Sequence, residues 1–146
     1  MNPTFTLDDH LCFALYGAHQ AMGAVYKPLL DPLGLTYPQY LVLITLWDQD
    51  AQSVGQIGAK LGLASNTLTP LLKRMERAGL LTRSRSANDE RQVILTLTDA
   101  GRAMEAQAAH ISGCILQASG LGLDGLIDLQ TRIRALRDRL GQSLES

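Results

Sequence analysis

The segment Ser53–Arg91 constrains the fold more than any other part of this 146-residue chain. Ser53 and Gln56 have the spacing of a capping box, and a glycine six positions later ends the helix that they open. Ser65 offers the next N-cap, and apolar residues at helical spacing continue from it as far as Gly79. The pattern predicts two short helices joined by a tight turn.

A hairpin with a charged tip follows the second helix. Leu80–Arg85 and Arg91–Leu97 are strand-like runs, and the polar turn Ser86–Glu90 separates them. Helix, turn, helix and hairpin together predict a winged helix-turn-helix, whose second helix enters a DNA groove. The fold class expected is mainly α with a small β-hairpin wing, and residues 36–98 form its DNA-binding part.

The flanking sequence predicts further helices. Thr6 and Asp9 suggest a capping box for a helix that runs to about Tyr26, before prolines and a glycine turn the chain. Thr36 caps a helix that is apolar almost all round, and Asp48–Gln52 is expected to be a polar loop.

Two more helices are expected after the hairpin. Thr98 caps one that continues to Ser119, and the next spans about Leu123 to Leu140. The last one repeats apolar residues at spacings of three and four, like a heptad seam. The seam consists of Leu126, Leu129, Ile133, Leu136 and Leu140.

The first and last helices carry more apolar surface than a small winged helix can cover. We therefore expect residues 6–30 and 99–142 to form a homodimer within a single-domain chain of residues 1–146. A two-fold dimer would set two recognition helices about 34–36 Å apart, one DNA turn, for a palindromic operator. Packing of these helices within a monomer is the alternative.

Charge is concentrated where DNA binding is predicted. The chain has a net charge of −1, but seven basic and three acidic residues between Lys60 and Arg91 give that segment a charge of +4. The N-terminus has no apolar signal segment, and no apolar run is long enough to cross a bilayer. A cytoplasmic protein without membrane contact is expected.

The second helix of the motif carries the residues predicted to meet double-stranded DNA. Small polar side chains in its first turns can reach base edges and phosphates, and basic side chains follow as phosphate contacts. The alternative is an ordinary solvated face on a structural helix. The residues are Ser65, Asn66, Thr67, Thr69, Lys73, Arg74 and Arg77.

At the hairpin tip, Arg91 follows three polar residues. An arginine on a β-ribbon can insert into a narrow minor groove, where the electrostatic potential is most negative. Asp89 is expected to orient Arg91 or an arginine of the recognition helix. The alternative is a polar hairpin tip without a DNA contact.

The two cysteines suggest either buried packing or redox chemistry. Cys12 precedes Tyr16 by one helical turn, and Tyr26 and Tyr37 follow later in the chain. A phenol hydroxyl that donates to a thiolate lowers the cysteine pKa. A thiolate reacts with peroxide to give sulfenic acid, which a second thiol such as Cys114 converts to a disulfide. A lone cysteine on a helix is more often a small buried hydrophobe.

No catalytic constellation is visible. The three histidines are scattered, and the chain has no HExxH, GxGxxG, Walker or CxxC motif. We expect a protein that is not an enzyme and that holds neither metal nor cofactor.

The chain resembles the multiple-antibiotic-resistance-regulator (MarR) family of winged-helix repressors over nearly its whole length. Residues 89–93 and 95–101 carry the likeness at the wing and its exit. Within that family it is most similar to the two-cysteine type of organic hydroperoxide resistance regulator. The blocks that carry this likeness are Leu11–Tyr16, Leu35–Tyr40 and Thr67–Lys73.

The resemblance implies that Cys12 senses organic hydroperoxide and that Tyr16 and the partner subunit's Tyr26 hydrogen-bond to it, with Tyr37 nearby. Cys114 resembles the second cysteine that forms an intersubunit disulfide in some members. Ser65, Thr67, Thr69 and Arg91 would contact DNA. Ala64-Ser65-Asn66 stands where Asp-Ser-Gly is expected, which affects the base contacts and not DNA binding itself.

Three functions remain open from the sequence. The first is a dimeric repressor that leaves DNA when Cys12 forms a disulfide with the partner's Cys114. The second is a repressor of the same fold gated by a phenolic or aromatic acid in the dimer pocket. The third is a thiol peroxidase that uses Cys12, against which the basic winged motif argues.

Overall fold

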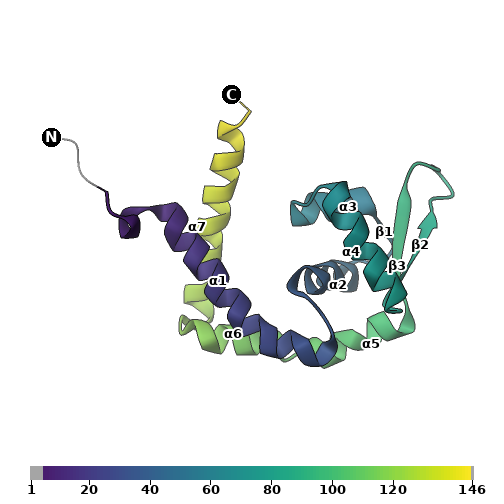
Figure 1. Cartoon of the computed structure of the whole chain (residues 1–146), viewed down its shortest axis with the longest axis horizontal. Helices are drawn as coiled ribbons and strands as arrows, with labels where there is room; N and C mark the ends of the chain where they lie inside the picture. Colours follow the sequence, from purple (N-terminus) through teal and green to yellow (C-terminus); the bar gives the residue numbers. More distant parts are fainter. Residues whose placement is uncertain (1–4, 146) are drawn as a thin grey trace. The chain divides into compact units, whose positions relative to one another are not determined.

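Three helices form the centre of the predicted DNA-binding part. The computed structural model describes residues 5–145, and Figure 1 shows these helices beside a small sheet. The predicted caps are present, because Thr36 with Gln39 and Ser53 with Gln56 form reciprocal capping boxes. The helices are α2 (Tyr37–Asp48), α3 (Val54–Leu61) and α4 (Ser65–Arg77).

The N-cap predicted for α4 is wrong by one residue. Ala64 occupies the N-cap position, and Ser65 is the first residue of the helix. Alanine has no side-chain oxygen, so no side chain caps the first amides of α4. At the other end Gly79, at a φ of 78°, stops the helix as predicted.

The predicted hairpin is part of a three-stranded antiparallel sheet. The strands are β1 (Gln52–Ser53), β2 (Leu81–Arg85) and β3 (Val93–Leu97), in the order β1-β3-β2. Both predicted hairpin strands begin later than expected, and the residues before β3 belong to the turn. The sequence missed β1, which was expected to be loop. Two residues are too short to show a strand period.

The hydrophobic core lies between α2, α3, α4 and the sheet. It is made of aliphatic side chains that repeat at helical spacing along α2 and α4, and a leucine of β3 completes it. These residues are fully buried, at 0% exposure: Val42, Leu43, Leu46, Ile57, Leu68, Leu72, Met75 and Leu95. Their close packing fixes α4 against the hairpin.

The first long helix begins and ends later than predicted. The capping box of Thr6 and Asp9 exists, but it opens a 3-10 turn, η1 (Leu7–Asp9), and α1 runs over Leu11–Leu30. Pro28 lies inside the last turn of α1, where only one backbone hydrogen bond is lost. A second 3-10 turn, η2 (Asp31–Leu33), then leads to α2.

The helix predicted from Thr98 to Ser119 is two helices. They are α5 (Asp99–Ala108) and α6 (Ile111–Ser119), and α7 (Gly122–Ser143) follows. No glycine or proline marks the break. The helical ladder is interrupted at Ala109, whose N–H donates to Ala106, three residues back.

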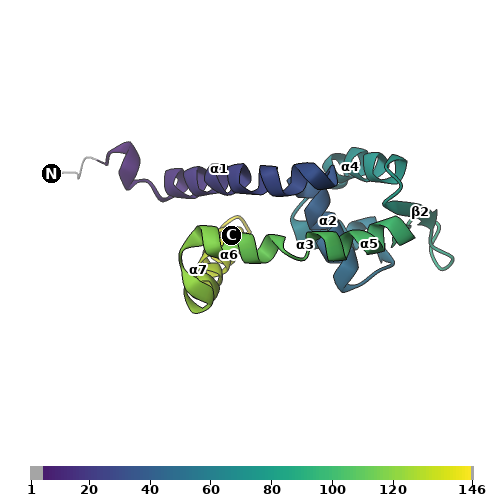
Figure 2. The ribbon, with the colours of Figure 1, turned by 90° about the horizontal axis from the view of Figure 1, so that it is seen from below.

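The chain forms two compact units, divided after Ala109. In the first unit α5 packs on α2 (Figure 2), where Trp47 Nε1 donates to the Gly101 carbonyl at 2.9 Å. In the second unit α6 packs on α7. Within residues 5–145, no helix is long and apolar enough to span a membrane.

Candidate DNA-binding surface and cysteine site

The outer face of α4 is polar and exposed, as its sequence predicts. Leu68, Leu71, Leu72 and Met75 are buried, which turns the intervening polar residues outward. Ser65, Asn66 and Thr67 are exposed in the first turn, and Thr69 is half-buried. Further along, a hollow of about 340 Å³ is lined by Thr69, Pro70, Lys73, Arg74 and Arg77.

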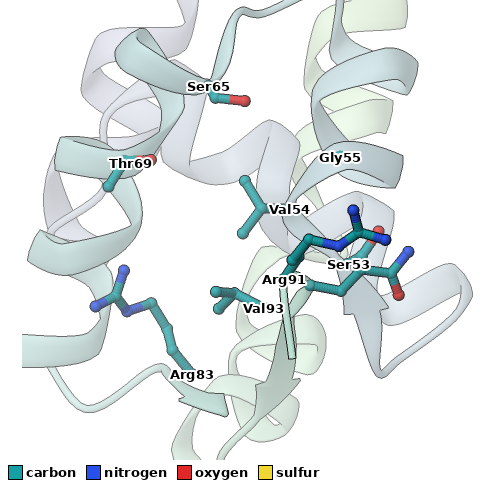
Figure 3. Close-up of a pocket in the computed structure, with 9 residues that line it drawn as sticks. Ser53, Val54, Gly55, Ser65, Thr69, Arg83, Arg91 and Val93 are labelled. Carbon is teal, nitrogen blue, oxygen red and sulfur yellow. The ribbon is translucent and has the colours of Figure 1, made fainter. Parts of the chain in front are cut away.

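A second cleft, of about 410 Å³, lies between α4, the start of α3 and the hairpin. Figure 3 shows Ser65 and Thr69 on the α4 side, Arg83 extending from the hairpin toward α4, and Arg91 pointing toward the start of α3. It brings Ser65 and Thr69 of the predicted recognition helix together with Arg91 of the wing. Arg83 is not among the residues that were predicted to contact DNA.

The wing tip presents Arg91 to solvent. Its side chain is 91% exposed, and the Asp89 carboxylate accepts hydrogen bonds from the Arg91 N–H at 3.0 Å and from Nε at 3.3 Å. Of the two partners predicted for Asp89, the structure pairs it with Arg91, and its orienting role stays a prediction. Arg85 steadies the same turn, since its Nη1 donates to the Glu90 carbonyl at 2.7 Å.

Cys12 is an exposed thiol near the start of α1, so within a single chain it does not fit the first of the two alternatives, a buried filler. Tyr16, one turn later, is also exposed, and its hydroxyl accepts a hydrogen bond from Gln20 Nε2 at 3.1 Å. Within the described part of the chain, no group hydrogen-bonds to the Cys12 sulfur. The hydroxyl proton of Tyr16 remains available for donation.

Tyr26 and Tyr37 meet where α1 turns into α2. Their rings are 4.7 Å apart, and Tyr40 lies 6.0 Å from Tyr26. Burial, followed by the neighbouring phenols, raises the pKa of Tyr26 to about 12, and burial likewise raises the pKa of Tyr37. Both phenols therefore keep their protons at neutral pH and can donate hydrogen bonds. A hollow of about 230 Å³ beside them also contains Lys27.

Cys114 lies in α6, in the second compact unit, and is half-buried and free. Its prediction as a resolving thiol stays a prediction. No group of three or more potential ligands that could hold a metal ion occurs in residues 5–145.

Long stretches of α1 and α7 expose large apolar side chains. Leu11 is 60% exposed at the start of α1, and Ile127 and Ile133 of α7 are 48% and 41% exposed. Three residues of the predicted seam are among the exposed ones, namely Leu129, Ile133 and Leu140. Apolar surface of this extent marks an interaction site.

The recognition helix, the exposed wing arginine and the sheet that joins them define a winged-helix DNA-binding protein. A family model described as transcriptional regulator SarA/Rot matches residues 24–107. The organic hydroperoxide resistance transcriptional regulator of Bacillus subtilis is 45% identical over 136 residues, which cover 93% of this chain and 92% of that protein. The chain belongs to the SarA/Rot and MarR-type family of winged-helix transcriptional regulators.

Two solved structures of AbfR, a protein of Staphylococcus epidermidis, are also similar. Reduced AbfR bound to DNA is 36% identical, with a TM-score of 0.80 and 96% of each chain covered. AbfR with its disulfide formed is 40% identical, with a TM-score of 0.67 over 89% of this chain and 91% of that one. The fold predicted from the sequence is confirmed, and the chain is a DNA-binding transcriptional regulator.

Proposed function

We propose that the protein is a homodimeric repressor that leaves its operator when an organic hydroperoxide oxidises Cys12. The exposure of the Cys12 thiol on α1 carries the proposal. It gains weight because the 45% identical relative from Bacillus subtilis is named for organic hydroperoxide resistance. AbfR, which has been solved reduced on DNA and with its disulfide formed, provides a precedent for disulfide formation in a related regulator.

Dimerisation would cover the apolar surface of α1 and α7. Burial of apolar area is worth about 25 cal/mol per Å², and a two-fold contact uses the same patch on both chains. The exposed side chains are spread along both helices, which suits an interface of two long elements. They include Phe13, Met22, Leu123, Ile127, Leu129, Ile133 and Leu140.

Each subunit would contribute one recognition helix and one wing to a palindromic operator. Ser65, Asn66, Thr67 and Thr69 would lie in the major groove, with Arg91, held by Asp89, in the minor groove. The basic side chains of α4 would bind phosphates on either side. These are Lys73, Arg74 and Arg77.

The oxidation proceeds in two balanced steps. The Cys12 thiolate attacks the terminal peroxide oxygen, the O–O bond breaks, and the alcohol leaves after taking up a proton. The Cys12 sulfenic acid is then attacked by the thiolate of the partner's Cys114, which forms the S–S bond and releases water after protonation. The peroxide is reduced and the two thiols are oxidised.

The tyrosines would prepare Cys12 for this reaction. A hydrogen bond donated to a thiolate favours the charged form, which is the nucleophile. Tyr16 has its hydroxyl proton free, and the raised pKa of Tyr26 keeps that phenol a donor. Tyr26 would act on the sensor of the other subunit, with Tyr37 supporting it through their ring contact.

Disulfide formation would lower operator affinity by changing how the two subunits of the dimer are held together. A disulfide requires Cα atoms about 4.4–6.8 Å apart, so closing it constrains the helices that carry the two cysteines. Any change in the spacing of the recognition helices lowers operator affinity. A tenfold loss needs only about 1.4 kcal/mol of coupling.

Replacement of the sensor tests the proposal. We expect Cys12→Ser to bind the operator like wild type and to stay bound in cumene hydroperoxide, because serine forms no sulfenate. A mobility-shift titration with and without peroxide measures this, and the reduced wild type, which peroxide should release from the operator, is the control. Release of Cys12→Ser at wild-type peroxide concentration would exclude Cys12 as the sensor.

The resolving role of Cys114 has its own test. Cys114→Ser should give a Cys12 sulfenate without a covalent dimer on non-reducing gels. A peroxide-induced crosslink that persists in this variant would exclude Cys114. Sustained peroxide consumption with a thiol reductant would instead favour a peroxidase, since a sensor reacts about once per oxidation.

A second candidate function is gating by an aromatic acid. The hollow beside Tyr26 and Tyr37 favours it, because Lys27 lines the same space and could pair with a carboxylate. Derepression by salicylate in a protein that ignores peroxide would select this function. Under the peroxide proposal, salicylate leaves operator binding unchanged.

A further inference from the structure

Glu76 is an acidic residue on the helix that is proposed to meet DNA. A carboxylate near phosphates repels them, so its presence on α4 calls for a physical reason. It does not face solvent freely. One oxygen, Oε2, accepts the Arg83 backbone N–H at 3.2 Å, and Oε1 lies 3.4 Å from Arg83 Nε.

The contact with Arg83 joins α4 to the edge of the sheet. In the order β1-β3-β2 the strand β2 lies at an edge, where a backbone N–H has no neighbouring strand to bind. Glu76 supplies the missing acceptor. One carboxylate therefore accepts a hydrogen bond from the main chain of Arg83 and forms an ion pair with its side chain, whose buried Nε has no hydrogen-bond partner within residues 5–145.

This contact occupies only one side of the Arg83 guanidinium. An arginine offers five N–H donors around a planar group, so one edge can bind Glu76 while the terminal nitrogens bind a second anion. Within residues 5–145, no hydrogen bond occupies these terminal nitrogens. The side chain is 27% exposed, and it extends from β2 toward α4 below Thr69 (Figure 3).

The cleft that Arg83 lines is suited to an anion. Arg83 and Arg91 give it two positive charges, and Ser65 and Thr69 offer hydroxyl groups. None of the residues that line it in the described part of the chain is acidic. It opens between the recognition helix and the wing, the two elements proposed to enter adjacent grooves. The DNA backbone is what runs between two adjacent grooves.

We propose that Arg83 binds a DNA backbone phosphate in this cleft, and that Glu76 is the positioning residue that holds the guanidinium for it. The pair would also make the recognition helix and the wing approach DNA as one rigid body. The inference rests on the DNA contacts proposed above for α4 and the wing. It does not depend on peroxide sensing.

Salt dependence of DNA binding distinguishes a phosphate contact from a structural one. The logarithm of the affinity falls with the logarithm of salt concentration by about 0.9 for each phosphate that is neutralised. A dimer that loses one phosphate contact in each subunit should therefore have a slope smaller by about 1.8. A variant that only loosens the fold would lose affinity without this change in slope.

The experiment uses the reduced full-length protein and a fluorescein-labelled duplex that the wild type selects from a randomised library. We expect Arg83→Gln to bind about tenfold more weakly at moderate salt, with the smaller slope. Arg83→Lys keeps the charge and should keep the slope. Arg139→Gln is the charge-matched control, because it removes one positive charge from α7, outside the recognition helix and wing.

The effect of Glu76→Gln on DNA affinity is expected to be opposite to the effect that charge repulsion alone predicts. Removing an acid near DNA would tighten binding if Glu76 only repelled phosphate, whereas loss of a positioning residue weakens it. We expect weaker binding and a reduced slope. We also expect no further weakening when the change is added to Arg83→Gln, since the two residues act as a unit.

An unchanged slope in Arg83→Gln, or tighter binding by Glu76→Gln, would overturn the proposal. Thermal unfolding followed by circular dichroism checks each variant. If Arg83→Gln does not fold, Glu76→Gln carries the test through the sign of its effect. Arg91→Gln, measured in parallel, tests the proposed wing contact. A failure of that contact can therefore be distinguished from a failure of the Arg83 proposal.

Discussion

The DNA-binding part, made of α2, α3, α4 and the sheet, buries its apolar residues, whereas the long helices α1 and α7 leave many of theirs exposed. In α2, α3, α4 and the sheet, apolar side chains pack against one another in a buried core. Along α7, and along α1 before its last turn, apolar residues at helical spacing remain on the surface. One part is covered within the chain, and the other leaves apolar surface exposed, as interaction sites do.

Under the proposed function, this difference separates DNA binding from its control by peroxide. A rigid, self-sufficient unit keeps the recognition helix and the wing in fixed register, as DNA reading requires. Cys12 lies in the other region, on the exposed part of α1. Under the proposed function, a modification there acts on how two reading units are spaced, without disturbing either of them.

The largest effect is expected in the DNA-reading part. Leu68 is fully buried in α4, so Leu68→Ala leaves a cavity and should lower the free energy of unfolding by about 2–5 kcal/mol. Urea unfolding of the reduced protein measures this. Ile44→Ala, at a position 40% exposed on α2, is the control and should cost less. Equal losses would mean that the core does not lie where we place it.

An intermediate effect is expected on α7. Ile133→Glu puts a charge into the exposed seam and should weaken the dimer at least tenfold, about 1.4 kcal/mol, because a buried charge needs a partner. Sedimentation analysis over a concentration series measures the association. Thr131→Glu adds the same charge off the seam and should leave the dimer intact. A wild-type protein that remains monomeric at every concentration would show that the exposed apolar surface does not form a dimer.

The smallest effect is expected at the junction of α1 and α2. The pKa of Tyr26 rises from 10 to about 12 on folding, so the folded chain holds this proton more tightly than the unfolded chain. The resulting stability is present below pH 10 and is lost as pH rises to 12. Unfolding free energies at pH 9, 10 and 11 should fall less steeply in Tyr26→Phe than in wild type.

Tyr16→Phe is the control for this pH series, since Tyr16 is an exposed tyrosine of the same helix. This substitution removes a phenol hydroxyl that is not buried. Identical curves for Tyr26→Phe and wild type would show that burial of the Tyr26 phenol has no energetic consequence.

Local patterns in the chain were enough to predict most of the fold. The capping boxes at Thr36 and Ser53 and the glycine after α4 set helix ends through contacts only a few residues apart. Predictions failed where short-range signals were ambiguous. Ser65 resembles an N-cap but is the first helical residue, and nothing in the sequence marks the break after Ala108.

In the candidate site, too, contacts between near neighbours in the sequence were predictable, whereas contacts between different elements were not. Asp89 and Arg91 are two residues apart, so their pairing was predictable from the sequence. Glu76 and Arg83 belong to different elements and meet only because α4 packs beside the edge strand β2. The pairing of β1 with β3 joins residues more than 40 positions apart, and no periodic pattern in the sequence predicts it.

Local signals were sufficient to predict the winged helix-turn-helix and its basic recognition helix, because caps, periodicity and charge act over one or two turns. Tertiary structure decided which arginines share a cleft, that Cys12 is exposed and that the phenols of Tyr26 and Tyr37 are close and partly buried. These properties depend on long-range packing, where distances are set by the core and not by position in the chain.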